Sequence, residues 1–204
     1  MNAQELAKVL LDKGAVKLSS TNEFVWASGI HSPVYCDNRL LLSFPDVRKK
    51  IAETFAETIQ NNFPQTDVIA GVATGAVAWG ALAAHILNKS YVYVRPGKKS
   101  YGLGNQIEGR FESNARITVV EDLVSTGGSS LKAVQALRDA SAKVTAMLAL
   151  FTYNLPLAGE NFQKAACTLN PLSDFDVLVD EAVRMTVLSS ADAKKMISWR
   201  NARK

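Results

Sequence analysis

The sequence predicts an α/β protein built on a mostly parallel sheet flanked by helices. Between residues 66 and 154, short apolar runs of strand type alternate with segments of helical pattern, as parallel strands joined by crossover helices require. One apolar run, residues 117–120, ends in two adjacent carboxylates, Glu121 and Asp122, and a loop of small residues follows. Ligands of open parallel sheets bind beyond the carboxyl ends of the strands. The pattern therefore predicts where a site lies as well as a fold.

Two helices are predicted ahead of the sheet. The N-terminal segment is an amphipathic pattern that ends at Gly14, and residues 43–63 repeat apolar side chains at every fourth position. The second pattern is typical of a helix that packs on a sheet, and a proline near its start suits a first helical turn. The apolar residues are Leu6, Val9 and Leu10 in the first helix and Val47, Ile51, Phe55 and Ile59 in the second, which begins near Pro45.

The alternation itself predicts four strands and two helices. The strands are expected at residues 66–71, 91–95, 116–122 and 143–154, and the helices at 75–88 and 126–140. Beyond the last strand, residues 171–204 predict two more helices, the first capped by Ser173 or Asp174 and the second by Ser190.

Two segments interrupt the alternation. Residues 24–39 combine short strand-like runs with turn signals at Ser28-Gly29 and Ser32-Pro33, so we expect a small antiparallel hood outside the main sheet. Residues 95–110 lie between two strands, yet they are polar and rich in glycine, with Lys98 among several cations. Long loops inside compact domains are usually functional or disordered, and the positive charge favours a function.

Length and composition fit a single soluble domain. The 204 residues are 48% hydrophobic and 21% charged, which allows one substantial core. No apolar run approaches the roughly 20 residues of a membrane span, and the N-terminus lacks the features of a signal peptide. Cys36 and Cys167 offer neither a disulfide framework nor metal-ligand spacing. We expect a cytoplasmic protein whose net charge of +4 suits anionic small molecules, with no nucleic-acid or membrane partner.

The loop after the acidic pair is suited to a phosphate. Gly127 and Gly128 allow a tight turn, and the backbone N–H groups of residues 125–130 form a positive cradle with the first turn of the next helix. The pattern is neither a Walker loop nor a dinucleotide fingerprint. A ribose 5-phosphate would satisfy the acids and the loop together. The structural alternative, an acidic pair that only favours a helix N-terminus, fits less well with a strand before it and a helix after it.

These segments carry a resemblance to a known family. "VVEDLVSTGGSS" (119–130) closely resembles the phosphoribosyl-pyrophosphate signature of type I phosphoribosyltransferases. "FVWASGIHSPVYCDNR" (24–39) resembles the hood motif of orotate phosphoribosyltransferases, and "YVRPGKKSYGLGNQIEG" (93–109) resembles their mobile catalytic loop. The resemblance implies a single domain, residues 1–204, of the type I phosphoribosyltransferase fold. Its small N-terminal hood is expected mainly within about residues 1–40, and its mobile catalytic loop at 96–109.

The resemblance implies transfer of the 5-phosphoribosyl group from phosphoribosyl pyrophosphate to orotate. The products are orotidine 5′-monophosphate and pyrophosphate, a step of de novo pyrimidine (UMP) biosynthesis. Mg²⁺ is expected, held by substrate oxygens and waters rather than by a protein cage, so no metal-ligating residue is predicted. A homodimer is implied, because the catalytic loop of the family reaches the active site of the neighbouring subunit.

The resemblance also implies residue roles. Lys99, Asp122 and Tyr101 are expected to be catalytic, and the acidic pair is expected to bind the ribose hydroxyls. Tyr101 stands where the family usually has a histidine, and a tyrosine is a poor proton shuttle at neutral pH. Residues 71–76 match the family's pyrophosphate loop. The expected orotate-binding residues are Thr126, Tyr35 and Cys36. Those expected to bind phosphoribosyl pyrophosphate are Arg95, Lys99, Tyr101, Glu121, Asp122, Leu123, Val124, Ser125, Thr126, Gly127, Gly128 and Ser129.

Three other functions remain open from the sequence. A purine or uracil phosphoribosyltransferase would share residues 117–130 but not the hood motif. A regulator that senses phosphoribosyl pyrophosphate would usually add a DNA-binding helical domain, for which residues 1–23 leave little room. The third alternative is a protein that binds the substrates without turning them over, and Tyr101 is the only residue that favours it.

Overall fold

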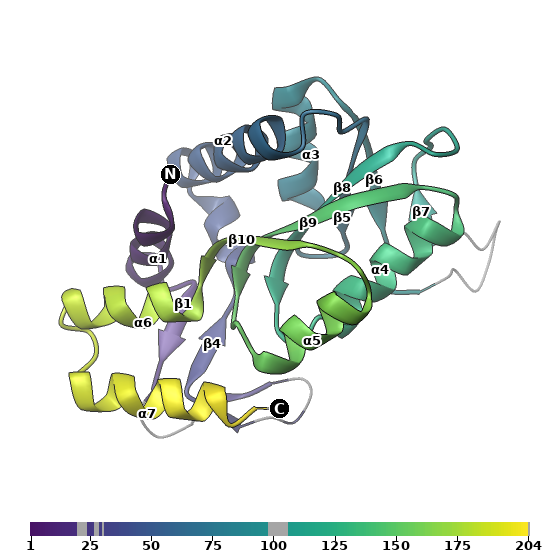
Figure 1. Cartoon of the computed structure of the whole chain (residues 1–204). Helices are drawn as coiled ribbons and strands as arrows, with labels where there is room; N and C mark the ends of the chain where they lie inside the picture. The colour runs from purple at the N-terminus through teal and green to yellow at the C-terminus, as the bar shows by residue number, and fades with distance from the viewer. Residues whose placement is uncertain (20–23, 27–28, 30, 98–105, 204) are drawn as a thin grey trace.

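A six-stranded sheet with strand order β10-β9-β8-β5-β6-β7 forms the centre of the molecule (Figure 1). The structure is a computed structural model that describes residues 1–19, 24–26, 29, 31–97 and 106–203. Neighbouring strands run parallel from β10 through β6, and β7 joins β6 in the antiparallel direction. The strands are β5 Val68–Val72, β6 Ser90–Val94, β7 Ile107–Glu108, β8 Arg116–Val124, β9 Lys143–Thr152 and β10 Leu169–Asp174.

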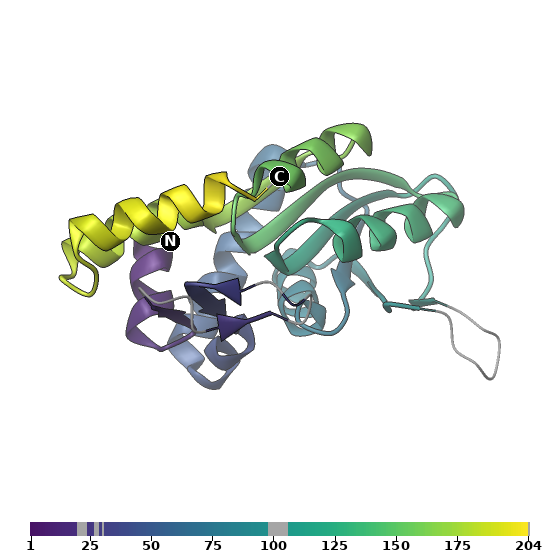
Figure 2. The same ribbon diagram turned by 90° about the horizontal axis from the view of Figure 1, so that it is seen from below.

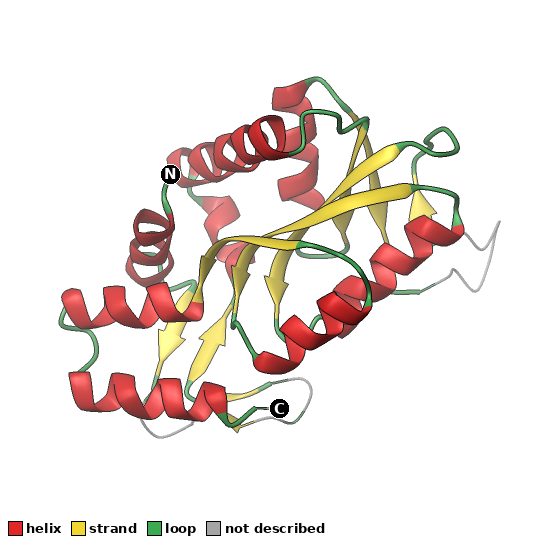
Figure 3. Ribbon diagram, in the orientation of Figure 1, coloured by secondary structure: helices red, strands yellow, loops and turns green. Residues whose placement is uncertain are grey.

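Helices cover both faces of this sheet (Figure 3). The chain passes from β5 to β6 in one direction along the sheet and from β8 to β9 in the other. Because such crossovers are right-handed, the two connecting helices lie on opposite faces. α3 (Val77–Leu87) covers one face with α2 (Pro45–Asn62), and α4 (Gly128–Asp139) covers the other with α5 (Pro156–Lys164). The predicted α/β class is confirmed.

The core follows from this double cover. In β9 every residue from Ala146 to Thr152 is buried, which is how a parallel strand covered on both faces should look. In α2 three residues of the predicted apolar face are confirmed as buried, since Ile51, Phe55 and Ile59 are 0–1% exposed. The fourth, Val47, is partly buried and packs against the same core.

The hood lies outside the sheet, as predicted (Figure 2). It contains two separate antiparallel pairs, β1 with β4 and β2 with β3, beside helix α1 and ahead of the 3-10 helix η1. The bounds are α1 Ala3–Asp12, β1 Val16–Leu18, β2 Phe24–Val25, β3 His31–Ser32, β4 Val34–Cys36 and η1 Asn38–Ser43.

Two helices end the chain, α6 (Phe175–Arg184) and α7 (Ser190–Asn201). Asp174 caps α6, because its carboxylate accepts from the backbone N–H groups of the next turn at 2.9 and 3.0 Å. The prediction of Ser190 as the second cap is wrong by one residue. Ser189 is the cap, and its hydroxyl accepts from Asp192 N–H at 3.1 Å.

Five elements were missed by the patterns: α5, β1, β7, β10 and η1. β10 carries Pro171, which normally argues against a strand, but β10 pairs only with β9 among the described strands and so tolerates it. The stretch 96–109 is not loop throughout, because Ile107–Glu108 pairs with β6. Lys98, Lys99 and Tyr101 lie outside the described residues. Across the described part of the chain, no helix has both the length and the apolar character needed to cross a bilayer.

Candidate active site

A cavity of about 320 Å³ lies at the carboxyl ends of β5 and β8, where one wall is the hood. The position is the one expected for an open parallel sheet. Three separate stretches of chain meet there: the end of β4 with η1, the loop after β5, and the end of β8 with the first turn of α4. The lining residues are Cys36, Asp37, Arg39, Val72, Ala73, Thr74, Gly75, Glu121, Asp122, Leu123 and Ser129.

The acidic pair forms part of this cavity wall, with Glu121 buried and Asp122 half-buried. Glu121 is only 4% exposed; its carboxylate accepts from the Ser130 hydroxyl at 2.8 Å and from the Asp122 backbone N–H at 3.0 Å. Burial raises the pKa of Glu121 well above its usual range, and the charge of Asp122 raises it further. Burial also raises the pKa of Asp122, which Arg39 partly opposes. Two adjacent carboxylates in this setting favour a ligand that donates hydrogen bonds.

The loop after β5 lies directly against Asp122. The peptide bond between Ala73 and Thr74 is cis. A Cβ atom added at Gly75 would overlap the carboxylate of Asp122, so the side chain of Asp122 can occupy this place only because residue 75 is glycine. The loop that matches the family's pyrophosphate loop and the acidic pair therefore form one surface.

The predicted phosphate loop has the backbone that its glycines suggest. Gly127 has a φ of +80°, and a Cβ there would lie 2.7 Å from the Phe162 ring, so only glycine fits. No side chain of the described residues caps α4, which leaves N–H groups of its first turn free for an anion. Asn161 of α5 donates to the Thr126 carbonyl at 2.9 Å and holds the loop from behind.

Asn38 is a site residue that the sequence analysis missed. Its side chain is 1% exposed, and its Nδ2–H donates to the Asp122 carbonyl at 2.6 Å. The Cys36 thiol donates to Asn38 Oδ1 at 3.1 Å. The hood is thereby joined to the acidic pair. The only signal in the sequence was the position of Asn38 within the hood motif, since no local pattern predicts a contact across 84 residues.

The hood residues predicted to bind the base differ in exposure. The Cys36 side chain is 9% exposed, and burial, followed by the charge of Asp122, raises the pKa of its thiol well above its usual range. It is a neutral wall residue. Tyr35 is 40% exposed, with its ring 5.9 Å from that of Phe24. Arg39 forms a two-bond ion pair with Asp37 at 2.7 and 2.9 Å and places positive charge in the cavity lining.

Arg95 follows β6 and carries an unsatisfied donor. Its Nη1 is buried without a hydrogen-bond partner in the described part of the chain, and Glu108 Oε1 lies 3.7 Å away. A buried guanidinium nitrogen in this state is suited to an anionic oxygen.

The structure thus gathers only part of the predicted site into the cavity lining. Cys36, Glu121, Asp122, Leu123 and Ser129 line it, whereas other predicted residues lie outside the lining: Tyr35, Arg95, Val124, Ser125, Thr126, Gly127 and Gly128. The Val124 side chain is fully buried, so any contact of Val124 with a ligand would involve its backbone.

The cavity lining offers carboxylate oxygens that a metal ion could use. Within the described residues, no group of three or more His, Cys, Asp or Glu side chains could cage an ion. The acidic pair nevertheless supplies hard oxygen atoms beside the cavity, which is what Mg²⁺ prefers when phosphates and waters complete its shell.

The fold and this site define a phosphoribosyltransferase. The family model "Phosphoribosyl transferase domain" matches residues 40–180. The chain is 43% identical to the orotate phosphoribosyltransferase of Porphyromonas gingivalis, over 97% of this chain and 94% of that one. It is 45% identical to that of Bacillus subtilis, over 97% and 91%. The chain belongs to the orotate phosphoribosyltransferase family.

Solved structures agree with this assignment. The crystal structure of orotate phosphoribosyltransferase from Aeropyrum pernix superposes with a TM-score of 0.78 at 31% identity, over 88% of this chain and 98% of that one. An adenine phosphoribosyltransferase from Leishmania donovani shares the fold, with a TM-score of 0.63 at 19% identity over 85% and 81%.

Glu121→Gln should raise the stability of the folded protein and lower its catalytic activity. Folding raises the Glu121 pKa above its ordinary 4.5, so the charged side chain opposes folding above the raised pKa, and this penalty fades as the pH falls toward 4.5. The variant should melt higher than wild type at about pH 8, with the difference disappearing near pH 4.5. Activity should fall about tenfold or more, because a hydrogen bond to a charged acceptor is lost.

Thermal denaturation across this pH range and initial rates measure both effects. Glu112→Gln is the matched control, because Glu112 is exposed. A stability difference that does not depend on pH would show that folding leaves the pKa of Glu121 unchanged.

Gly127→Ala should damage the phosphate loop. The new side chain requires a φ of +80° and a place 2.7 Å from the Phe162 ring. The expected cost is about 1–3 kcal/mol of unfolding free energy, with weaker binding of phosphoribosyl pyrophosphate. Gly159→Ala is the control, because a Cβ there meets nothing within 4 Å; it should stabilise α5 by about 0.5–1 kcal/mol. Urea denaturation and calorimetric titration give the two readouts, and unchanged affinity would contradict the assignment.

Proposed function

We propose that this protein transfers the 5-phosphoribosyl group from phosphoribosyl pyrophosphate to orotate in a Mg²⁺-dependent reaction. Orotidine 5′-monophosphate and pyrophosphate are the products, as a step in making UMP. The observation that carries the proposal is one cavity in which the hood, the loop after β5 and the acidic pair meet. Membership in the orotate phosphoribosyltransferase family supports the choice of base.

The acidic pair would act on the sugar. The ribose 2- and 3-hydroxyls donate hydrogen bonds to Glu121 and Asp122, which satisfies two carboxylates that burial has left poorly solvated. Their negative charge also stabilises the ribose as it becomes oxocarbenium-like, because these groups are already in place when charge develops. The first turn of α4 receives the 5-phosphate.

The hood would recognise the base. Cys36 and Arg39 lie in the same wall as the acidic pair, so a planar base held there faces the ribose. Arg39 offsets the carboxylate of orotate, and Tyr35 stacks on the ring. Thr126 contacts orotate from the opposite side.

Departing pyrophosphate needs positive charge. Arg95 has a free buried donor among the described contacts, and Lys99 and Tyr101 of the catalytic loop join it by the family resemblance. Mg²⁺ would neutralise part of this charge when bound, and the carboxylates of Glu121 and Asp122 in the cavity lining would be available to hold it. A loop closed over the site would exclude water from the activated sugar.

We further propose a cytoplasmic homodimer. The catalytic loop of each subunit would complete the site of its partner. The two free, buried cysteines are compatible with a reducing compartment.

Orotate absorbance tests the proposed reaction. With phosphoribosyl pyrophosphate and Mg²⁺ present, orotate should be consumed, and EDTA should stop the reaction. Arg95→Gln and Lys99→Ala should each lower kcat/KM by about a hundredfold, because each removes a charged contact to pyrophosphate. Arg184→Gln is the control, since Arg184 is exposed at the end of α6.

Parallel reactions with uracil and hypoxanthine separate the alternatives. Preferential turnover of either would assign the protein to another phosphoribosyltransferase activity. Tight binding of phosphoribosyl pyrophosphate without turnover of any base would indicate a sensor.

Subunit mixing tests the shared site. Asp122→Asn and Lys99→Ala chains should each be nearly inactive alone. Co-refolded in equal amounts, they should regain about one quarter of wild-type activity, because half of the dimers are mixed and each has one intact site. If each loop serves its own subunit, mixing restores nothing.

A further inference from the structure

The hood is held by side chains and not by the main sheet. Among the described strands, those of the hood pair only with one another, so its position over the cavity depends on tertiary contacts. One contact is Asn38, described above. A second set of contacts involves Trp26, which lies between the end of β9 and the C-terminal helix α7.

Trp26 connects three parts of the molecule. Its ring stacks on that of Tyr153 with 4.4 Å between centroids and meets Trp199 of α7 edge-on at 5.8 Å. Its Nε1–H donates to the Val34 carbonyl at 3.0 Å. Val34 begins β4, the strand that delivers Tyr35 and Cys36 to the site. A shift of Trp26 therefore shifts the wall that faces the base.

Helix α7 and the residue Arg203 after it also donate hydrogen bonds directly to the start of β3 in the hood. Trp199 Nε1–H donates to the His31 carbonyl at 3.1 Å, and Arg203 donates to the same oxygen at 3.3 Å. His31 starts β3, and β4 follows two residues after β3 ends. Figure 1 shows α7 beside the hood strands, and Figure 2 shows the same neighbourhood from below.

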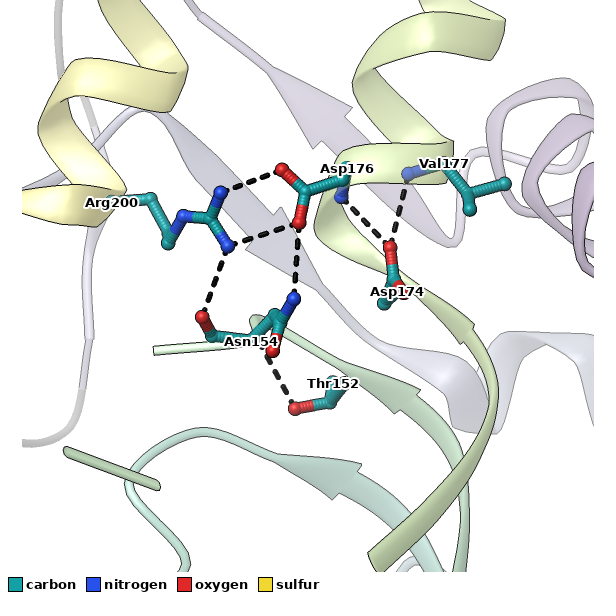
Figure 4. Close-up of polar contacts among 6 residues, drawn as sticks. All are labelled: Thr152, Asn154, Asp174, Asp176, Val177 and Arg200. Carbon is teal, nitrogen blue, oxygen red and sulfur yellow. Dashed lines mark hydrogen bonds and ion pairs between the residues drawn. The ribbon is translucent and has the colours of Figure 1, made fainter. Parts of the chain in front are cut away.

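Arg200 fixes α7 to the body of the protein (Figure 4). Its guanidinium donates to both oxygens of Asp176 at 2.6 and 3.0 Å and to the Asn154 carbonyl at 3.1 Å. Asn154 in turn donates to Asp176 at 3.0 Å. The Arg200 side chain is 12% exposed, so this pair is better shielded than an ordinary surface ion pair.

We propose that α7 sets the position of the base-binding hood, with Arg200 and Trp199 as positioning residues for orotate. Arg200 holds the helix against Asp176 and Asn154, and the helix holds Trp26 and His31. Neither residue lines the cavity, and neither touches the acidic pair or the phosphate loop. The inference rests on the proposed function, because it assumes that the hood binds the base.

Arg200→Gln tests the inference through the two Michaelis constants. The KM for orotate should rise roughly five- to tenfold, while kcat and the KM for phosphoribosyl pyrophosphate change by less than about twofold. Arg200→Lys keeps the charge but not the two-bond geometry, so its KM for orotate should fall between those of wild type and Arg200→Gln. Arg184→Gln, on the exposed end of α6, should leave both constants unchanged.

A second variant guards against misfolding of the first. Trp199→Phe combined with Arg203→Gln removes both donors to His31 but keeps a ring against Trp26. It should show the same selective rise for orotate. An equal rise in both constants, or a lower melting temperature with no change in either, would overturn the inference. If the wild-type protein does not turn over orotate, the proposed function and the inference are both overturned. If the wild-type protein does turn over orotate but the variants change the KM for orotate no more than the KM for phosphoribosyl pyrophosphate, only the inference is overturned.

Discussion

The adjacency of a buried carboxylate, Glu121, and a half-buried one, Asp122, at the end of β8 is the constraint on which the site depends. Desolvation makes the charged forms costly, and several contacts surround the pair. Ser130 donates to Glu121, Asn38 donates to the Asp122 backbone, and Gly75 leaves space for the Asp122 carboxylate. These contacts come from three elements far apart in sequence. The acidic pair therefore specifies how the hood, the loop after β5 and α4 must meet.

The fold separates two tasks in space. β8 pairs with β5 over four residue pairs and with β9 over eight, which fixes the register of the strands whose carboxyl ends form the site. The groups that would handle sugar and phosphate therefore lie on rigid strands and at a helix N-terminus. The hood has no such ladder to the sheet among the described strands. Its position depends on aromatic contacts and on a few hydrogen bonds. On the proposed function, the groups that bind the phosphate lie on rigid elements, whereas the position of the groups that bind the base depends on how the hood packs.

Local pattern predicted most of the fold and about half of the cavity wall. β5, β8 and β9 are apolar runs, and α2 shows its buried face in the spacing of Ile51, Phe55 and Ile59. β10 was missed because Pro171 is unfavourable in a strand unless the strand lies at an edge, and edge position is a property of the whole sheet. Asn38 was missed for the same kind of reason, since the partner of its side chain is 84 residues away.

Glycine at position 75 allows the loop after β5 to lie directly against the Asp122 carboxylate. Any residue with a Cβ at this position would overlap the Asp122 carboxylate in the present arrangement. With glycine, the carboxylate lies against the loop and receives its compensation from backbone N–H groups and from Arg39. Arg39 is the one positively charged side chain among the described residues that line the cavity. On the proposed function, charge neutralisation moves to the α4 N-terminus, to Arg95 and to Mg²⁺, which act on the phosphates. The acidic pair binds the sugar. Because separate groups then bind the sugar and the phosphates, the hood must hold the base in line with the bound sugar.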